Sequence, residues 1–198
     1  MFFLSWSKCL FRRNILQGKK TLNLRCRKIQ SEFGTMTAVS SEKGIVLLEF
    51  ESIQNLQKEL SEIEKILNSK ITYESDSCLK ILEKELSEYF SGERKTFTVP
   101  LDLQGTDFQI SVWKALLEIP YGSTRTYQQQ SEFLGNTKAI RAVGTANGKN
   151  RIAVLVPCHR VIGRDGSLVG YKGGIEIKKK LLELERKHSG ESLLFPDL

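Results

Sequence analysis

The 198-residue sequence has no long hydrophobic run, and a membrane-spanning helix needs roughly 20 consecutive apolar residues. A membrane-embedded protein is therefore excluded. Cysteine is scarce, with four residues, and the 15 glycines follow no triplet repeat, which excludes a disulfide scaffold and a collagen-like chain. No internal repeat is present. What remains is a chain with 40% hydrophobic residues and mixed charge, enough for an ordinary core in one or two folded domains.

Clustered metal ligands are also missing. The four cysteines are widely spaced, at Cys9, Cys26, Cys78 and Cys158. They form no C-x-x-C pair, and only two histidines could join them, whereas a structural zinc site needs four ligands close together. We therefore expect no metal. The apolar start of the chain is interrupted by Lys8 and does not resemble a secretory leader, so we expect an intracellular protein with reduced thiols.

Acidic residues are absent from positions 1–31, which hold eight basic residues. Two interpretations stay open, an organelle transit segment or an extension with no structural role. Because no clear apolar helical face is present, we expect residues 1–27 to be a basic N-terminal extension outside the fold. Beyond it, residues 32–100 hold 8 Lys+Arg against 13 Asp+Glu, and residues 101–188 hold 14 against 8. A polyanion would bind the basic second half.

Residues 28–100 have the pattern of a small α/β domain. We expect an extended stretch over 29–39, a turn at 40–44 and a strand over 45–50, which together make an antiparallel hairpin. Apolar residues at helical spacing predict a helix over 52–67 and a second from Leu79 to Phe90, ended by Ser91-Gly92. Nothing in this domain indicates chemistry.

Residues 101–188 are predicted to form a mostly helical second domain, followed by a tail over 189–198. Capping residues predict helices over 108–117, 127–134 and 138–144, the last one capped by Asn136-Thr137. Two short helices joined by a glycine-containing turn, the second one basic, are typical of a helix-turn-helix, although plain helix packing gives the same pattern. The expected fold class is an α/β N-terminal domain plus a mostly α C-terminal domain with a helix-turn-helix, α+β overall.

The helix predicted over 138–144 has few large side chains. Ala139, Ala142, Gly144 and Ala146 leave one side nearly bare, with Arg141 as its one long cation. A major-groove reader carries several polar side chains, so a bare helix fits the minor groove better. Arg141 would then fill the space left by an extruded base. Alternatively, the small residues pack against a neighbouring helix.

A candidate nucleophile follows an apolar run. Residues 151–156 predict a buried strand, which Pro157 ends, and Cys158 and His159 come next. A cysteine held in this way is a candidate nucleophile because a neighbouring base can generate the reactive thiolate. Adjacent side chains on an extended chain point apart, so His159 would act through a bridging water. An inert buried cysteine is the alternative.

The segment Pro157-Cys158-His159-Arg160-Val161 resembles the active-site signature of the O6-alkylguanine-DNA alkyltransferases, or methylated-DNA–protein-cysteine methyltransferases. The resemblance runs from about Gly105 to Glu185, through Tyr127-Gln128-Gln129, residues 139–144, Asn150 and residues 170–174. Residues 29–50 are also similar to the opening of the family's N-terminal domain. The resemblance implies two domains, the second with a helix-turn-helix.

The implied activity is DNA repair by direct reversal. An O6-alkylated guanine, and as a further substrate O4-alkylthymine, is flipped out of the duplex, and its alkyl group passes to Cys158. A thioether is a poor leaving group, so the reaction is stoichiometric, irreversible and free of cofactors. The implied partner is double-stranded DNA containing alkylated bases, bound by a monomer without a membrane. The implied location is the cytoplasm, or the nucleus in a eukaryote.

The resemblance also assigns roles, position by position. His159 would take the Cys158 proton through water, and Glu185 would orient His159 and balance its charge. Tyr127 would donate a hydrogen bond to guanine N3, and Asn150 would brace the turn before the cysteine. The remaining implied residues are Arg141, Ala142 and Tyr127 at the DNA, and Val161, Tyr171 and Lys172 around the guanine. Without the resemblance, Glu185 is interpreted as a solvated helix charge and Tyr127 as an aromatic that fills a helix start.

Two positions depart from the family pattern. Arg151 stands where members commonly have proline, which either loosens the loop or adds a phosphate contact. Gly173 stands where some members have a bulky residue, so we expect a pocket that accepts groups larger than methyl.

Two other classes of protein fit the sequence less well. A lesion-binding module of the alkyltransferase-like kind replaces the reactive cysteine, whereas Cys158 is present here. A thiol hydrolase would have no use for a bare helix bearing Arg141.

Overall fold

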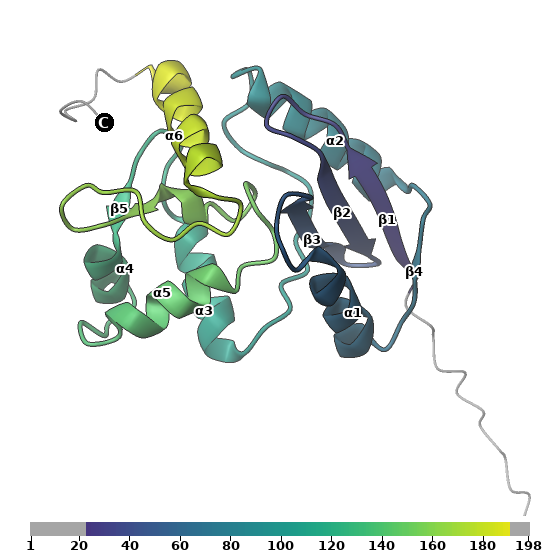
Figure 1. Ribbon diagram of the computed structural model, residues 1–198, viewed down its shortest axis with the longest axis horizontal. Coiled ribbons are helices and arrows are strands. Elements are labelled where there is room, and N and C mark those ends of the chain that lie inside the picture. The colour runs from purple at the N-terminus through teal and green to yellow at the C-terminus, as the bar shows by residue number, and fades with distance from the viewer. Residues whose placement is uncertain (1–22, 191–198) are drawn as a thin grey trace, which may run out of the picture.

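The computed structural model describes residues 23–190 as two units that lie side by side (Figure 1). The first unit holds a sheet of order β3-β2-β1-β4, in which β1 pairs antiparallel with β2 and parallel with β4, and β2 pairs antiparallel with β3. Its strands are β1 (Leu24–Ile29), β2 (Met36–Ser41), β3 (Gly44–Phe50) and β4 (Ile71–Thr72). Its helices are α1 (Leu56–Leu67) and α2 (Ser77–Phe90).

Alternating side chains along the strands divide the apolar residues between the two faces of the sheet. Ala38 joins a core that includes Leu82 of α2, whereas Val39 joins a smaller core that includes Leu60 and Ile63 of α1. The two helices therefore cover opposite faces (Figure 1). The core on the α2 side continues into the second unit, where it includes Val143 and Val154.

The start of the first unit differs from the prediction. The expected single extended stretch over 29–39 is wrong, because the chain turns at Gly34, which has a φ of +113°. In that turn the Gly34 amide donates to the Ser31 carbonyl at 3.0 Å. Strand β1 begins at Leu24, so residues 24–27 belong to the sheet and not to the basic extension expected over 1–27. Residues 1–22 of that extension, and 191–198 of the tail, lie outside the described residues.

The second unit is mostly helical. Its elements are α3 (Asp107–Leu117), β5 (Arg125–Thr126), α4 (Tyr127–Phe133), α5 (Ile140–Gly148), the 3-10 turn η1 (Cys158–Arg160), β6 (Val161–Ile162) and α6 (Ile175–Ser189). Capping boxes at Thr106 and Thr126 begin α3 and α4 where the sequence predicts. The expected cap of α5 at Asn136-Thr137 is wrong, because α5 follows Ala139, and the Asn136 side chain accepts from the Lys138 amide.

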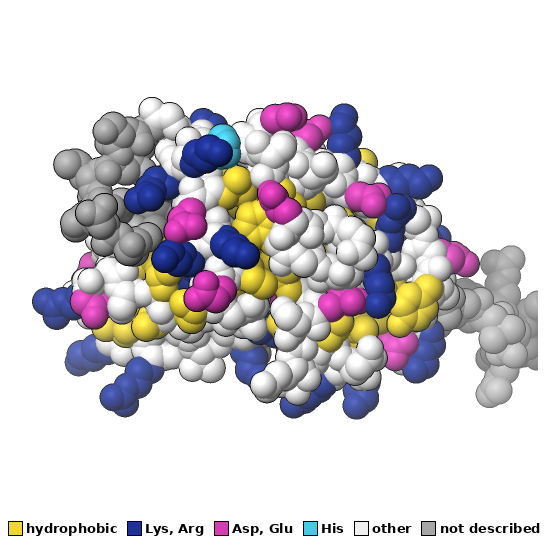
Figure 2. Space-filling model, turned by 45° about the horizontal axis from the view of Figure 1, so that its top comes forward, with side chains coloured by type: hydrophobic (Ala, Val, Ile, Leu, Met, Phe, Trp, Pro, Cys, Tyr) yellow, Lys and Arg dark blue, Asp and Glu magenta, His cyan; other side chains and the backbone are white. Residues whose placement is uncertain are grey.

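Two kinds of contact hold the second unit together and to the first. Trp113 of α3 donates its indole N–H to the Ala146 carbonyl of α5 at 2.9 Å, which fixes α5 against α3. Strand β3 meets the second unit at a backbone bridge between Leu48 and Ile152. On the face seen in Figure 2, basic and acidic side chains are interspersed, so this face does not present one sign of charge.

None of the helices in the described part of the chain combines the length and the hydropathy that crossing a bilayer requires.

Candidate active site

The segment before Cys158 is buried but does not form the predicted strand. Ile152 makes a single bridge to β3, and the chain then folds back, with the Val156 amide donating to the Ile152 carbonyl at 3.0 Å. Val154 has a φ of +69°, which is costly for a β-branched residue. The apolar composition of residues 151–156 predicted their burial. A strand, however, needs a neighbouring strand along its length, and in this segment only Ile152 forms a bridge to one. Cys158 therefore opens the turn η1.

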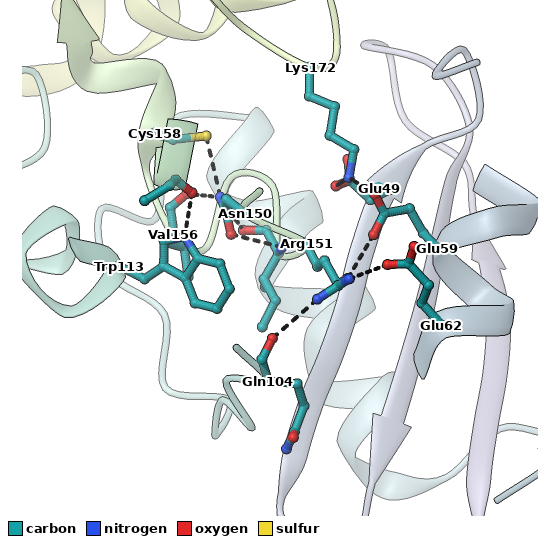
Figure 3. Close-up of polar contacts among 12 residues, drawn as sticks. Glu49, Glu59, Glu62, Gln104, Trp113, Asn150, Arg151, Val156, Cys158 and Lys172 are labelled. Carbon is teal, nitrogen blue, oxygen red and sulfur yellow. Dashed lines mark hydrogen bonds and ion pairs between the residues drawn. The ribbon is translucent and has the colours of Figure 1, made fainter. Parts of the chain in front are cut away.

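Asn150 holds this folded segment together (Figure 3). Its side-chain carbonyl accepts from the Ile152 amide at 3.0 Å. Its NH2 donates to the Val156 carbonyl at 2.9 Å and to the Cys158 Sγ at 3.3 Å. The side chain is buried, and a buried amide with all these partners fixes the local backbone.

The Cys158 thiol is protonated at neutral pH. Burial raises the pKa of Cys158 to about 11, although the hydrogen bond from Asn150 lowers it. A thiolate therefore forms there only if a base removes the proton. No disulfide joins cysteines of the described residues.

His159 is the group next to this thiol, and it is fully buried. Its Nε2 lies 2.8 Å from Oε1 of Glu185. Because a carboxylate only accepts, Nε2 carries the proton, and Nδ1 of the neutral ring is an acceptor. This Nδ1 is buried and has no hydrogen-bond partner within residues 23–190. Burial, together with the charges of Arg160 and Lys178, lowers the pKa of His159 against the opposing effect of Glu185, so the ring is neutral at neutral pH.

Glu185 is not the solvated charge that helix position alone indicated, since it is fully buried. Arg160 donates from Nε and Nη2 to both of its oxygens at 2.9 Å. Tyr89 of α2 donates at 2.5 Å and the Gly122 amide at 3.1 Å. Burial raises the pKa of Glu185, but His159 and Arg160 outweigh burial and hold that pKa well below its usual range.

The sequence predicted no role for Arg160 and Tyr89 of this network, or for Lys178 beside it. Arg160 was part of the quoted motif, and its adjacency to His159 was the available signal. Tyr89 carried no signal, because an aromatic among leucines on a helix is interpreted as core. Lys178 is fully buried and donates to the carbonyls of Val161 and Val169 at 2.6 and 2.7 Å. Its spacing from Leu181, Leu182 and Glu185 on one helical face was the signal.

Tyr127 and Tyr171 both lie close enough to Cys158 to feel a charge on its sulfur. The Tyr127 hydroxyl is 3.4 Å from the Val169 carbonyl and 3.5 Å from that of Gly170. Burial, and then the charge of a Cys158 thiolate, raise the pKa of Tyr127, so its phenol stays a donor. The Tyr171 ring meets the His159 ring edge-on, with centroids 6.4 Å apart, and its hydroxyl is buried without a partner in the described chain.

The expected DNA-facing residues lie on the open side of α5. Arg141 and Ala142 are exposed, whereas Val143, Ala146 and Asn147 turn inward. The packing alternative thus holds for Ala146 and fails for Ala142. An open pocket lies beside this face, lined by Tyr127, Gln128, Ile140, Gly144 and Arg164.

The residues expected around the guanine have different surroundings in the structure. Val161 is buried in β6, and Tyr171 faces His159. The Lys172 side chain instead reaches the first unit, where its Nζ lies 2.5 Å from Glu49 and 3.0 Å from Glu59. Arg151 also binds α1, through Glu59 and Glu62, so its charge is not free for a phosphate. Gly173 lies against Tyr171 and Phe50. That the pocket accepts groups larger than methyl stays a prediction.

These groups define a class of protein before any comparison. A buried thiol is held next to a neutral imidazole that is itself held by a buried carboxylate, which is the arrangement of a cysteine nucleophile with its base. The thiol lies in the same unit as two short helices, α4 and α5, and α5 exposes small residues and one arginine. The class is therefore a thiol-dependent protein that carries a helix-turn-helix.

Comparison with known proteins gives the family. The ribonuclease-like domain of the 6-O-methylguanine DNA methyltransferases matches residues 24–103, and their DNA-binding domain matches residues 107–187. The methylated-DNA–protein-cysteine methyltransferase of Methanosarcina barkeri is 43% identical over 160 residues, covering 81% of this chain and 96% of its own. The chain belongs to the 6-O-methylguanine DNA methyltransferase family, as the resemblance of residues 105–185 predicted.

Solved structures agree in fold. The O6-methylguanine methyltransferase of Mycobacterium tuberculosis superposes with a TM-score of 0.71 at 41% identity, covering 83% of this chain and 94% of its own. A structure of the same organism's protein in complex with DNA also has a TM-score of 0.71, at 40% identity, and covers 84% of this chain and 94% of its own. The predicted fold class, a sheet domain followed by a helical domain with a helix-turn-helix, is confirmed.

Proposed function

We propose that this protein repairs alkylated DNA by moving the alkyl group from O6 of guanine to Sγ of Cys158. The observation that carries the proposal is a buried thiol that accepts from Asn150, followed in the chain by His159, whose Nδ1 has no partner in the described residues and whose Nε2 is held by Glu185. Family membership supplies the reaction class, and the relatives it matches are named for it.

The first step is removal of the thiol proton. A neutral His159 accepts it at Nδ1 through a bridging water, and the Glu185 carboxylate stabilises the imidazolium that results. Arg160 keeps Glu185 ionised, so the negative charge is present before the proton arrives. The thiolate accepts the Asn150 amide hydrogen bond.

In the second step Sγ bonds to the alkyl carbon as the bond from that carbon to O6 breaks, and the electron pair stays on the guanine. Tyr127 donates a hydrogen bond to N3, which stabilises the purine as it leaves. Val161, Tyr171 and the backbone at Lys172 line the base pocket. The thioether that forms has no route back to a thiol, so each molecule reacts once.

A base inside a duplex cannot reach a buried thiol, so the lesion must leave the stack. The exposed face of α5 enters the minor groove, and Arg141 occupies the space that the base leaves. Ala142 beside it allows a close approach of the helix. The partner is thus double-stranded DNA with an alkylated base.

The organisation of the protein follows from the same groups. All of the proposed site residues lie in one chain, so a monomer suffices. We divide the chain into a sheet domain that ends near residue 100 and an alkyl-transfer domain that ends with α6. DNA as substrate places the protein in the cytoplasm, or in the nucleus of a eukaryotic cell.

Intact mass tests the proposal. Incubation with duplex DNA containing O6-methylguanine should add one methyl group per molecule, and the Cys158→Ala variant should add none while it still binds the duplex. Binding with no mass gain in the wild type would instead indicate a lesion-binding module. Repeated turnover of a small ester would indicate a thiol hydrolase.

A further inference from the structure

Five charged side chains form a cluster where the two units meet (Figure 3). The cluster consists of Glu49, Glu59, Glu62, Arg151 and Lys172. The three carboxylates come from β3 and α1 of the first unit, and the two cations come from the second. Arg151 stands where family members commonly have proline, so this cation does not follow from the family motif.

Glu59 occupies the centre of this cluster. Its Oε2 lies 2.7 Å from Nε of Arg151, and its Oε1 lies 3.0 Å from Nζ of Lys172. Burial raises the pKa of Glu59, but Lys172 and Arg151 lower it more, so the carboxylate is ionised. One side chain of the first unit therefore holds two separate segments of the second unit through its two oxygens.

The first of these segments leads to the nucleophile. Arg151 follows Asn150, whose amide contacts Cys158 Sγ at 3.3 Å. The Arg151 carbonyl also accepts from the Leu48 amide at 2.8 Å, and its Nη1 donates to the Gln104 carbonyl at 3.2 Å. The backbone at the base of the Cys158 segment is thus attached to the first unit by both main chain and side chain.

The second segment packs against the imidazole. Lys172 follows Tyr171, whose ring packs edge-on against His159. Lys172 also binds Glu49, which is 1% exposed, so the lysine is held by two carboxylates at once. Movement of Lys172 would displace Tyr171, and with it the wall that faces the base and the imidazole.

We propose that Glu59 is a positioning residue for alkyl transfer, because it fixes the separation between the Asn150–Cys158 segment and the Tyr171–Lys172 segment. The inference rests on the transfer reaction proposed above. It gives the first unit, which already supplies Tyr89 to the proposed proton path, a second part in the reaction. Small displacements of reacting groups lower rates steeply, so loss of this link should be visible in the chemical step.

The test is the single-turnover rate constant of the Glu59→Gln variant at saturating O6-methylguanine duplex. The variant keeps the shape of the side chain and removes its charge. We expect the rate constant to fall about tenfold or more, while the DNA dissociation constant stays within about twofold. Glu64→Gln is the matched control, because Glu64 lies on the same helix and binds Lys70 and the Ile71 amide instead of the cluster.

Variants of Lys172, the partner of Glu59, distinguish a positioning role from a role in stability alone. Lys172→Met should reproduce the loss, and Lys172→Arg, which keeps a cation, should restore most of the rate. The double variant Glu59→Gln/Lys172→Met should be no slower than the slower single variant, because both changes break the same bridge, which runs from Arg151 through Glu59 to Lys172. A lowered Tm with an unchanged rate constant in Glu59→Gln and Lys172→Met would overturn the inference.

A measurement without DNA keeps this inference distinct from the reaction itself. Labelling of Cys158 by iodoacetamide, read from peptide masses, reports access to the thiol between the two segments. We expect labelling in Glu59→Gln to be several-fold faster than in wild type or Glu64→Gln, and equal labelling would count against a positioning role. Absence of a methyl mass gain in the wild type would instead defeat the proposed transfer reaction and leave the labelling result to judge Glu59.

Discussion

Glu185 and Glu49 are both almost fully buried, with exposed fractions of 0% and 1%, yet their surroundings differ. Glu185 accepts hydrogen bonds from Tyr89, the Gly122 amide, His159 and Arg160. Within the described chain, Glu49 has one hydrogen-bond donor, the Lys172 ammonium group. The first carboxylate belongs to the proposed proton path, and the second to the cluster that joins the two units.

The difference in donors gives the two groups different charge states. Burial raises the pKa of Glu49 to about 7, because Lys172 offsets only part of the desolvation. Burial acts on Glu185 too, but His159 and Arg160 outweigh it, and its pKa lies well below the usual range. Equal burial thus produces a permanent anion where several donors converge and a titrating group where one does. The proton path requires the permanent anion.

The largest effect should follow from Glu185→Gln. The variant removes the negative charge that faces both Arg160 and His159, so an uncompensated guanidinium stays buried. We expect the free energy of unfolding to fall by about 3–5 kcal/mol. The transfer rate constant should fall about 100-fold or more, since the imidazolium loses its stabilising charge. Urea unfolding and single-turnover methyl transfer measure the two effects.

Glu49→Gln is the matched change, and it shows whether the transfer rate depends on any buried carboxylate or on the charge at Glu185. If a buried carboxylate as such were needed, this variant would lose the transfer rate as Glu185→Gln does. We expect its rate constant instead to stay well above that of Glu185→Gln, because Lys172 keeps Glu59 as a partner. Equal losses in the two variants would contradict the comparison.

The pH dependence of stability should reveal Glu49 next. Its folded pKa is about 7 and its ordinary value is 4.5, so the folded chain binds this proton more tightly than the unfolded chain. The stability that this proton contributes is complete below about pH 4.5 and is lost as pH rises through 7. Removing the group should lessen the fall in unfolding free energy from pH 5 to pH 8 by about 3 kcal/mol. Urea unfolding of wild type and Glu49→Gln at both pH values tests this, and an equal fall in both proteins would contradict it.

A smaller effect should follow from Tyr89→Phe, which removes one donor from Glu185 and nothing else. A hydrogen bond to a buried charge contributes about 2 kcal/mol, so the unfolding free energy should fall by about that amount. Arg160 and His159 stay in place, so the methyl-transfer rate should fall only a few-fold. A loss as large as that of Glu185→Gln would mean that the donors act as one indivisible unit.

The sequence predicted the parts of the fold that depend on local signals. Helices α3 and α4 begin at Thr106 and Thr126, as their capping residues indicated, and α2 ends before Ser91-Gly92. Burial of residues 151–156 was also predictable. Their conformation was not, because an apolar run is compatible with a strand or a buried turn, and Asn150 selects the turn through contacts up to eight residues away.

The candidate site likewise has a part that the sequence predicted and a part that it could not. Cys158, His159 and Asn150 lie within ten consecutive positions, and the family resemblance indicated all three. The cluster around Glu59 could not be predicted, because Arg151 is 92 positions from Glu59 and only the packing of the two units brings them together. Tyr89 is 96 positions from Glu185, for the same reason. Long-range polar contacts have no periodicity that a single sequence would reveal.

The smallest effect should follow from Glu51→Gln, which extends the comparison to a carboxylate at the edge of the same strand region. Glu51 follows β3 by one residue and pairs with Lys28 at 2.8 Å, and it accepts from Thr37 at 2.9 Å. These two partners lower the pKa of Glu51. Both partners are also available to a glutamine oxygen, and water screens the lysine charge, so the loss should stay below about 1 kcal/mol. Urea unfolding at low and high salt measures it. A loss of unfolding free energy as large as that of Tyr89→Phe would mean that exposure to water does not weaken this ion pair. Burial and the number of donors would then not explain the contrast between Glu185 and Glu49.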